Sequence, residues 1–332
     1  MKLKDILVTG GAGYIGSHTL VELHNSGYRP IIVDNLSNTS LDNIKGAEKI
    51  IKNKITFYEF DCTNKNQMNE LFKLESNIEA VIHFAAFKAV EESVREPKKY
   101  YDNNIGSLEV LLKTMKRYKV NNIIFSSSCT VYGSPDILPV SELAPFKKAE
   151  SPYGETKQLC EKLIDKSDIN SISLRYFNPV GSHETCLIGD CSADKPNNLV
   201  PIICEVASGK RNSMQIFGND YKTIDGTCVR DYIHVVDLAK AHVAALNHIL
   251  NCKKIKTAYN IGLGKGVSVQ EVIDSFEKVN DMKISYKIGQ RRAGDVEEIY
   301  SDNSKINEEL NWFPVMSIES ALKTAWSWER NK

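Results

Sequence analysis

Thr9-Gly10-Gly11-Ala12-Gly13-Tyr14-Ile15-Gly16 decides the fold, because this stretch spaces glycines three residues apart between a short apolar run and a helical pattern. Gly10 permits a tight turn, Gly13 lets the backbone approach a pyrophosphate closely, and Gly16 allows the helix to pack against the preceding strand. The N–H groups and partial positive charge at the start of that helix attract phosphate oxygens. A glycine triplet also occurs in turns that bind nothing, so the interpretation depends on its surroundings.

Short β-branched runs alternate with stretches of helical spacing through the first half of the chain. Apolar residues fill consecutive positions in these runs, as in parallel strands that are buried on both faces. Alternation of strand and helix is typical of a doubly wound parallel sheet. We therefore predict an α/β fold with a Rossmann-type doubly wound parallel sheet, whose strands lie at Ile6–Thr9, Pro30–Asp34, Ile55–Phe60, Ala80–Ala85, Asn122–Ser127 and Ile172–Phe177.

Asp34, at the end of the second run, supports the dinucleotide interpretation. A carboxylate at this point accepts hydrogen bonds from the diol of an adenine ribose and would repel a 2′-phosphate. With a strand before the glycines and a helix after them, the pattern predicts that the cofactor is NAD and not NADP.

The regular alternation ends near Phe177, after which prolines and glycines separate shorter elements. We predict an NAD-binding domain over residues 1–177 and a smaller, interleaved substrate lobe over residues 178–332. Ile233–Val236 and Tyr259–Ile261 are predicted to be strands that return to the larger sheet. Residues 231–262 are therefore expected to belong partly to the larger domain.

The charge balance narrows the range of partners. The chain has 332 residues with 42 Lys and Arg against 42 Asp and Glu, so its net charge is zero. Such a chain lacks the positive field that favours nucleic acid or an anionic membrane surface. No apolar run approaches the roughly 18 residues that a membrane span requires. The apolar run near the start of the chain is too short for the hydrophobic region of a secretory signal.

Cysteine and histidine spacing indicates neither a disulfide framework nor a metal site. The eight cysteines contain no C-x-x-C pair, which favours reduced thiols in a cytoplasmic protein. The seven histidines contain no H-x-x-x-H pair on a helix, and no metal is predicted.

Tyr153 and Lys157 lie four residues apart after Pro152, which suits the first turn of a helix. This spacing places both side chains on one helix face. A phenol ionises near pH 10, and a neighbouring ammonium or a cationic nicotinamide ring would favour the phenolate. One Tyr–Lys pair at this spacing is expected by chance, but this pair follows a serine run at a strand end, where open α/β sheets place their sites.

Together these motifs resemble the extended short-chain dehydrogenase/reductases. The resemblance covers essentially the whole chain and is most specific in four stretches: Thr9–His18, Ser126–Gly133, Arg175–Gly181 and Val229–Val235. It points to the branch of that family that inverts C4 of UDP-hexoses, such as UDP-galactose and UDP-glucose. In that branch NAD accepts a hydride from C4 and returns it to the other face of a 4-keto sugar.

The resemblance implies three sets of site residues. In the catalytic set, Tyr153 is the base for the sugar 4-hydroxyl, Lys157 tunes it and holds a ribose, and Ser128 bonds the same oxygen. The NAD-binding set is Gly10, Gly13, Tyr14, Ile15, Gly16, Asp34, Asn35, Asp61, Cys62, Phe84, Ala85, Lys88, Asn103, Tyr153, Lys157 and Phe177. The set that binds the UDP-sugar is Ser128, Tyr153, Asn178, Asn198, Leu199, Phe217, Arg230, Arg292 and Asp295.

Other chemistries on the same fold remain as alternatives. Dehydratases of this family carry an acidic pair after the catalytic Ser or Thr, and decarboxylases carry a Glu there, whereas this chain has Cys129 and Thr130. A non-catalytic NAD-binding protein is the other alternative, but such proteins commonly lack the Tyr or the Lys.

Two further features are expected from the same resemblance. Ile299 falls where members restricted to unsubstituted hexoses carry a Tyr, so UDP-GlcNAc and UDP-GalNAc are candidate substrates. Apolar stripes at Asn104–Lys119 and Pro152–Lys166 fit either the core or a two-fold interface, and related enzymes are commonly homodimers.

Overall fold

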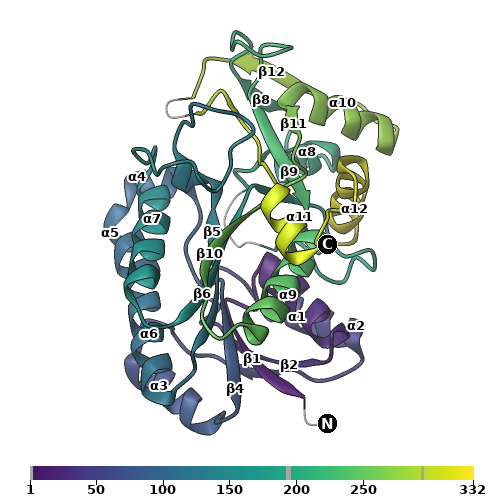
Figure 1. The fold of residues 1–332 in the computed structure, drawn as a ribbon. Coiled ribbons are helices and arrows are strands. Elements are labelled where there is room, and N and C mark those ends of the chain that lie inside the picture. The colour runs from purple at the N-terminus through teal and green to yellow at the C-terminus, as the bar shows by residue number, and fades with distance from the viewer. Residues whose placement is uncertain (1–2, 192–195, 293–294) are drawn as a thin grey trace.

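A seven-stranded parallel sheet forms the centre of the larger lobe (Figure 1). The structure, a computed structural model, describes residues 3–191, 196–292 and 295–332. The strands follow the order β10-β6-β5-β4-β1-β2-β3, and all their pairings are parallel. Their bounds are β1 Lys4–Thr9, β2 Tyr28–Val33, β3 Thr56–Tyr58, β4 Ile78–His83, β5 Asn122–Ser128, β6 Asn170–Tyr176 and β10 Lys256–Ile261.

Helices cover both faces of this sheet, because side chains alternate between its faces and both sets are apolar. Ile6 and Val8 of β1 pack into the core on one face, and Leu7 packs into the core on the other. The first face is covered by α1 (Tyr14–Asn25), α2 (Asp42–Ile51), α9 (Val235–Asn251) and α11 (Ser304–Leu310). The second is covered by α3 (Lys65–Leu74), α6 (Gly106–Tyr118) and α7 (Pro152–Lys166), with α4 (Val90–Arg95), α5 (Pro97–Tyr100) and the π-helix η1 (Tyr101–Ile105) nearby.

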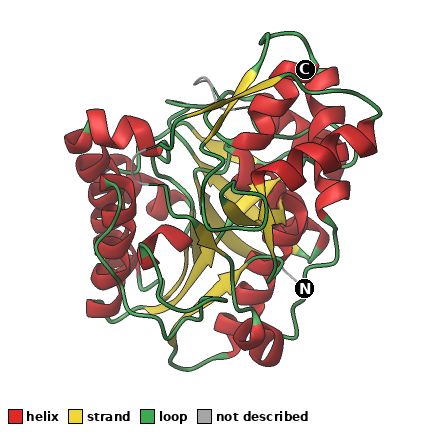
Figure 2. Ribbon diagram, turned by 90° about the horizontal axis from the view of Figure 1, so that it is seen from above, coloured by secondary structure: helices red, strands yellow, loops and turns green. Residues whose placement is uncertain are grey.

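The second lobe lies beyond the carboxyl ends of these strands and has its own core. In the view from above, helices stand on both sides of the central strands (Figure 2). Its strands are β7 (Asn178–Val180), β9 (Val229–His234), β11 (Gly266–Ser268) and β13 (Glu298–Ile299) in one sheet, and β8 (Met214–Phe217) and β12 (Tyr286–Gly289) in another. Its helices are α8 (Leu199–Ala207), α10 (Val269–Asn280) and α12 (Ile318–Asn331), while the 3-10 turn η2 (Cys129–Tyr132) follows β5.

One strand prediction is wrong. Ile233–Val236 is not a strand of the large sheet, because β9 ends at His234 and pairs in the smaller sheet. The His234 Nδ1 accepts a hydrogen bond from the backbone N–H of Val236 at 3.1 Å and so caps α9. The apolar run therefore spans a strand end and a helix start. Tyr259–Ile261 is confirmed as part of β10, which joins the large sheet beside β6.

None of the described helices is both long enough and apolar enough to span a lipid bilayer.

Candidate functional site

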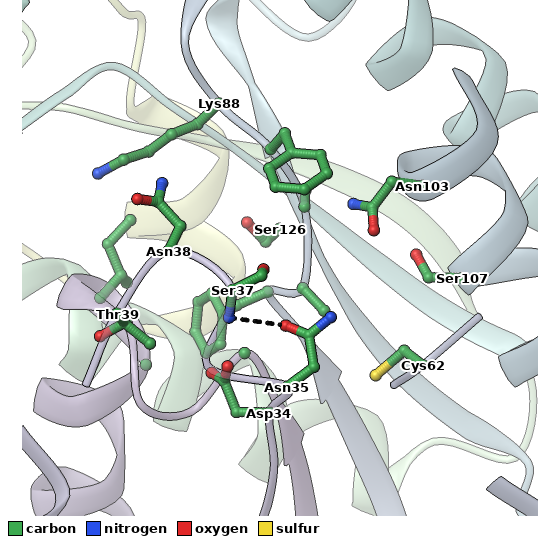
Figure 3. Close-up of a pocket in the computed structure, with 18 of the residues that line it drawn as sticks. Asp34, Asn35, Ser37, Asn38, Thr39, Cys62, Lys88, Asn103, Ser107 and Ser126 are labelled. Carbon is green, nitrogen blue, oxygen red and sulfur yellow. Dashed lines mark hydrogen bonds between the residues drawn. The ribbon is translucent and has the colours of Figure 1, made fainter. Parts of the chain in front are cut away.

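An open cavity of about 1050 Å³ lies at the carboxyl ends of the large sheet, against the glycine stretch (Figure 3). The structure brings together here almost all of the residues predicted to bind NAD. Those that line the cavity are Gly10, Gly13, Tyr14, Ile15, Gly16, Asp34, Asn35, Asp61, Cys62, Phe84, Ala85, Lys88, Asn103, Tyr153 and Lys157.

The glycine turn is packed too tightly for side chains. A Cβ atom at Gly16 would lie 2.4 Å from the carbonyl oxygen of Gly10, and one at Gly10 would lie 2.7 Å from the backbone nitrogen of Ala85. Gly10 also has a φ of +70°, which only glycine adopts without strain. Gly13 is the N-cap of α1 and makes no side-chain cap, so the first N–H groups of the helix face the cavity without a covering side chain. This arrangement fits a pyrophosphate.

Asp34 and Asp61 place carboxylates at the far end of the cavity. Asp34 accepts hydrogen bonds from the backbone of Ala12 at 3.1 Å and of Leu36 at 3.0 Å, while burial raises its pKa above the usual range. Burial also opposes ionisation of Asp61, but hydrogen bonds from Thr63 and Asn35 hold its pKa below the usual range. Both carboxylates are therefore available to accept hydrogen bonds from a ribose or an adenine.

Sequence reasoning missed several residues of the same cavity. The loop after Asn35 could have been found, because it follows the carboxyl end of a predicted strand. Ser107 and Cys191 carried no such signal, since only packing brings them to the cavity. The missed residues are Ser37, Asn38, Thr39, Phe60, Ala86, Phe87, Ser107, Ser126, Tyr176 and Cys191.

Tyr153 and Lys157 enter the cavity from the first turns of α7. Ser151 caps this helix by accepting a hydrogen bond from the N–H of Gly154 at 3.2 Å, and Pro152 occupies its first turn. The Lys157 Nζ donates to the carbonyl oxygen of Ser126, at the end of β5, at 2.7 Å. Tyr153 is 8% exposed and Lys157 4%, so both are desolvated at the cavity wall.

The pKa shifts of Tyr153 and Lys157 do not show the lowering of the tyrosine pKa by a neighbouring ammonium that the spacing predicts. Burial raises the pKa of Tyr153 well above 10, the neighbouring Tyr176 raises it further, and only a hydrogen bond from Ser128 lowers it. Burial lowers the pKa of Lys157 to about 8. The Lys157 Nζ lies 5.8 Å from the centre of the Tyr153 ring and is directed at the Ser126 carbonyl, which explains why burial dominates. The described chain by itself thus keeps Tyr153 protonated.

A second cavity of about 1430 Å³ adjoins the first and shares Asn38 and Lys88 with it. It is lined by Asn198, the N-cap of α8, and by Arg292. The Arg292 guanidinium donates to Asp295 at 2.6 Å and lies 5.4 Å from the centre of the Phe217 ring.

Arg230 lies 3.8 Å from the same Asp295 carboxylate. Four residues predicted to bind the UDP-sugar therefore form one cluster: Phe217, Arg230, Arg292 and Asp295. The two guanidinium groups share the Asp295 carboxylate, and guanidinium groups so placed can bind an anion with directional hydrogen bonds.

The remaining predicted residues lie beside the cavities or behind them. Phe177 is 3% exposed and packs with Ile299 in a small core cluster, so its side chain does not line the first cavity. Asn178 lies in β7 opposite Tyr232, and Leu199 begins α8. The Ser128 hydroxyl accepts a hydrogen bond from the N–H of Thr130 at 3.2 Å.

Thr130 supplies an unsatisfied polar atom near these groups. Its hydroxyl oxygen is buried and has no hydrogen-bond partner within the described part of the chain. Leaving such an atom without a hydrogen bond costs free energy of folding, unless a ligand or a water molecule supplies the missing partner. No carboxylate takes the places of Cys129 and Thr130, so elimination chemistry has no acidic pair here.

Comparisons with known proteins match nearly the whole chain. A family model described as GDP-mannose 4,6 dehydratase matches residues 7–325. UDP-glucose 4-epimerase of Dictyostelium discoideum is 47% identical over 98% of this chain and 95% of its own length.

Two solved structures are also similar over 99% of the chain. A UDP-glucose 4-epimerase of Stenotrophomonas maltophila, with bound NAD and formylated UDP-arabinopyranose, has a TM-score of 0.96 at 40% identity and covers 99% of this chain and 98% of its own. That of Bifidobacterium longum, in complex with NAD+ and UDP, has a TM-score of 0.94 at 44% identity and covers 99% of each chain.

Proposed function

Because this chain belongs to the UDP-glucose 4-epimerases, within the extended short-chain dehydrogenase/reductases, we propose that it interconverts UDP-galactose and UDP-glucose by inverting C4 of the hexose. The enzyme is an isomerase that uses NAD. The observation that supports this best is the convergence of Tyr153, Lys157 and Ser128 beside a dinucleotide cavity, with no acidic pair at Cys129 and Thr130.

Each residue has a distinct task in this proposal. Tyr153 takes the proton from the sugar 4-hydroxyl and returns it, while Ser128 bonds the same oxygen. Lys157 holds a nicotinamide ribose while it remains anchored to the Ser126 carbonyl. When bound, NAD supplies a positive ring that favours the Tyr153 phenolate and exchanges a hydride with C4 of the sugar.

Arg230 and Arg292 are assigned to the diphosphate of the substrate. Guanidinium groups bind phosphate oxygens with directional, charge-assisted hydrogen bonds. In the structure both guanidinium groups turn to Asp295, and Arg292 also lies 3.7 Å from Glu91. A diphosphate would compete with these carboxylates. We also propose that residues 1–177 bind NAD and that residues 178–332 mainly bind the UDP-sugar, with residues 231–262 belonging partly to the larger domain.

The decisive experiment supplies the purified protein with UDP-galactose and no external NAD. We expect UDP-glucose to form without accumulation of NADH, because the hydride returns to the sugar in each turnover. Product is identified by chromatography and NADH by its absorbance. Accumulation of a 4-keto-6-deoxy sugar would instead assign the chain to the dehydratases, and no product at all would favour a binding protein.

Acetylated substrates are a second proposal, and Ile299 is the residue that favours it. This side chain is 4% exposed and belongs to a core cluster with Val131 and Phe177, against which Cys129 packs. A Tyr at this position would extend past that cluster, whereas Ile leaves more room for a 2-acetamido group. We expect turnover of UDP-GalNAc, and Ile299→Tyr should suppress it more than turnover of UDP-galactose. The same assay checks both sugars, and no turnover of UDP-GalNAc by the unmodified protein would contradict the proposal.

A homodimer in the cytoplasm is the third proposal. On α4, which packs beside α7, Val90 is 47% exposed and Val94 61%, so an apolar patch adjoins the helices expected at the interface. The eight cysteines are free, which suits a reducing compartment. Sedimentation should give twice the mass of one chain, and fractionation should recover the protein with cytoplasmic markers. A monomer, or recovery elsewhere, would contradict the respective part.

A further inference from the structure

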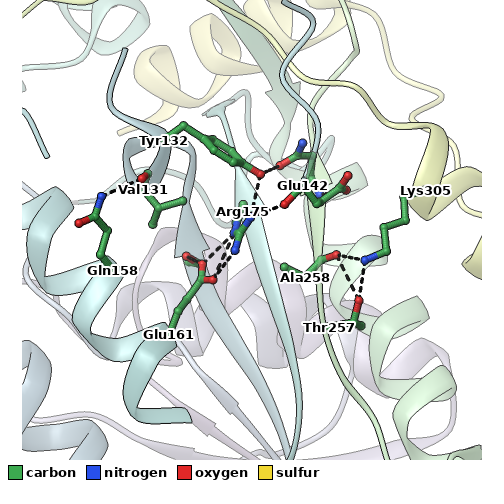
Figure 4. A network of polar contacts seen from close by, with 11 residues as sticks. Val131, Tyr132, Glu142, Gln158, Glu161, Arg175, Thr257, Ala258 and Lys305 are labelled. Atoms are coloured by element: carbon green, nitrogen blue, oxygen red, sulfur yellow. Dashed lines mark hydrogen bonds and ion pairs between the residues drawn. The ribbon is translucent and has the colours of Figure 1, made fainter. Parts of the chain in front are cut away.

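Arg175, on β6, lies at the centre of a buried polar network that joins α7, the segment after β5, and β10 of the large sheet (Figure 4). Its side chain is 9% exposed, and its Nε and Nη2 atoms donate to the Glu161 carboxylate at 3.0 and 2.7 Å. Glu161 lies on α7 one turn after Lys157 and also accepts a hydrogen bond from the Ser127 hydroxyl. Arg175 thus secures the helix that carries Tyr153 and Lys157 to the strand end that carries Ser126 and Ser128.

The other arm of the guanidinium points away from α7. The Arg175 Nη1 donates to the Tyr132 hydroxyl oxygen at 3.1 Å and to the Glu142 carbonyl oxygen at 3.4 Å. The Tyr132 hydroxyl in turn donates to the Asn260 side chain at 2.6 Å. The Asn260 backbone N–H donates to the Glu142 carboxylate at 2.7 Å. The fork of one arginine therefore joins α7 to the segment that follows β5 and, through Tyr132 and Glu142, to β10.

The network continues to the cluster of arginines. The Asn260 Nδ2 donates to the Val140 carbonyl oxygen at 2.8 Å, and the Val140 N–H donates to the Tyr300 carbonyl oxygen at 2.9 Å. The next residue, Ser301, donates through its N–H and hydroxyl to Asp231 at 3.0 and 2.6 Å. Asp231 is 0% exposed and directly follows Arg230 on β9.

We propose that Arg175 is a positioning residue, which fixes the distance between the Tyr153–Lys157 pair and the Arg230–Arg292 cluster. This proposal rests on the proposed function. A sugar held by its diphosphate in one lobe must present its 4-hydroxyl to Tyr153 in the other, and a misplacement of about 1 Å costs about 100-fold in rate. Only a guanidinium offers planar donors to partners on both sides at once; an ammonium cannot.

A simpler view makes the Arg175–Glu161 pair a stabilising contact only. Breaking a buried ion pair does destabilise a protein. However, a purely stabilising pair would leave the turnover of the folded molecules unchanged. Both views therefore predict that variants of Arg175 are less stable, but only the positioning role predicts a lower kcat in the molecules that remain folded.

The test compares Arg175→Lys and Tyr132→Phe with the unmodified holoenzyme. Arg175→Lys keeps the charge and loses the fork, and Tyr132→Phe removes one hydroxyl without leaving a buried charge unpaired. We expect kcat for UDP-galactose to fall about 10- to 100-fold in both variants, with KM and the Kd of UDP changed by less than about threefold. NAD content per chain should be unchanged.

Arg29→Lys is the matched control. The Arg29 Nε and Nη2 atoms donate to the Asp5 carboxylate at 2.7 and 2.8 Å, and Asp5 is 2% exposed, but this pair lies at the amino ends of β1 and β2. We expect lower thermal stability and an unchanged kcat. A kcat per folded molecule that stays within about twofold of the unmodified protein in Arg175→Lys, or that falls equally in Arg29→Lys, would overturn the proposal. Failure of the proposed function is distinguishable, because the unmodified protein would then convert no UDP-galactose.

Discussion

Tyr153→Phe is expected to lower kcat for UDP-galactose by about a thousandfold, while NAD and UDP remain bound. General acid–base groups contribute about 10²- to 10⁴-fold, and this substitution removes the only atom of the side chain that can take a proton. The hydroxyl is also the atom that the Ser128 hydrogen bond stabilises as a phenolate. Initial rates of UDP-glucose formation give kcat, and the Kd of UDP is measured by calorimetry.

Tyr118→Phe is a suitable control for the loss of a tyrosine hydroxyl. Tyr118 lies at the end of α6, and its hydroxyl donates to the carbonyl oxygen of Asn69 on α3 at 3.0 Å. It lines neither cavity. Its loss should leave kcat unchanged. If Tyr153→Phe keeps more than about a tenth of the original kcat, Tyr153 is not the base, and another group must exchange the proton.

Gly16→Ala is expected to abolish retention of NAD and to lower stability by about 1–3 kcal/mol. The added Cβ would lie 2.4 Å from the Gly10 carbonyl oxygen and 2.8 Å from the Gly11 Cα. Both are backbone atoms, so the glycine turn itself must move away from the start of α1. Cofactor released on heat denaturation measures the NAD content, and thermal unfolding of the same samples measures stability.

Gly106→Ala separates the effect of the turn from that of any added methyl group. Gly106 has a helical φ of −60°, and its Cβ would meet no atom within 4 Å beyond its chain neighbours and the backbone of its own helix. The substitution should keep NAD bound and raise stability by about 0.4–1 kcal/mol. Full NAD content in Gly16→Ala would show that the turn tolerates a side chain and that its close packing is not what holds the pyrophosphate.

The large sheet could be predicted from the sequence because its strands are apolar on consecutive positions and end at polar or glycine residues. The dinucleotide cavity followed from the same rule, since strand ends of a parallel sheet meet at one edge. Ile233–Val236 was misassigned because apolar residues lie on both sides of the boundary: Ile233 near the end of β9, and Val235 and Val236 at the start of α9. His234, which caps that helix, gave no signal in the sequence that would separate the two.

Contacts between distant residues could not be predicted. Arg175 and Asn260 lie 85 positions apart but face each other across β6 and β10, and both bond to Tyr132 and Glu142. The protonation state of Tyr153 was likewise out of reach, because the spacing places Lys157 on the same helix face but does not show that its ammonium turns to the Ser126 carbonyl. Directions of side chains depend on packing from several elements, and spacing along one helix does not contain that information.

The return of the chain to the large sheet has a consequence for folding. Residues 178–234 build much of the second lobe before α9 covers one face of the sheet and β10 extends its edge beside β6. A fragment that stops at residue 177 would leave the edge of β6 open to pairing with other chains and the apolar face of α1 uncovered. We therefore expect that neither lobe folds on its own and that both lose amide-exchange protection in one cooperative step rather than one after the other.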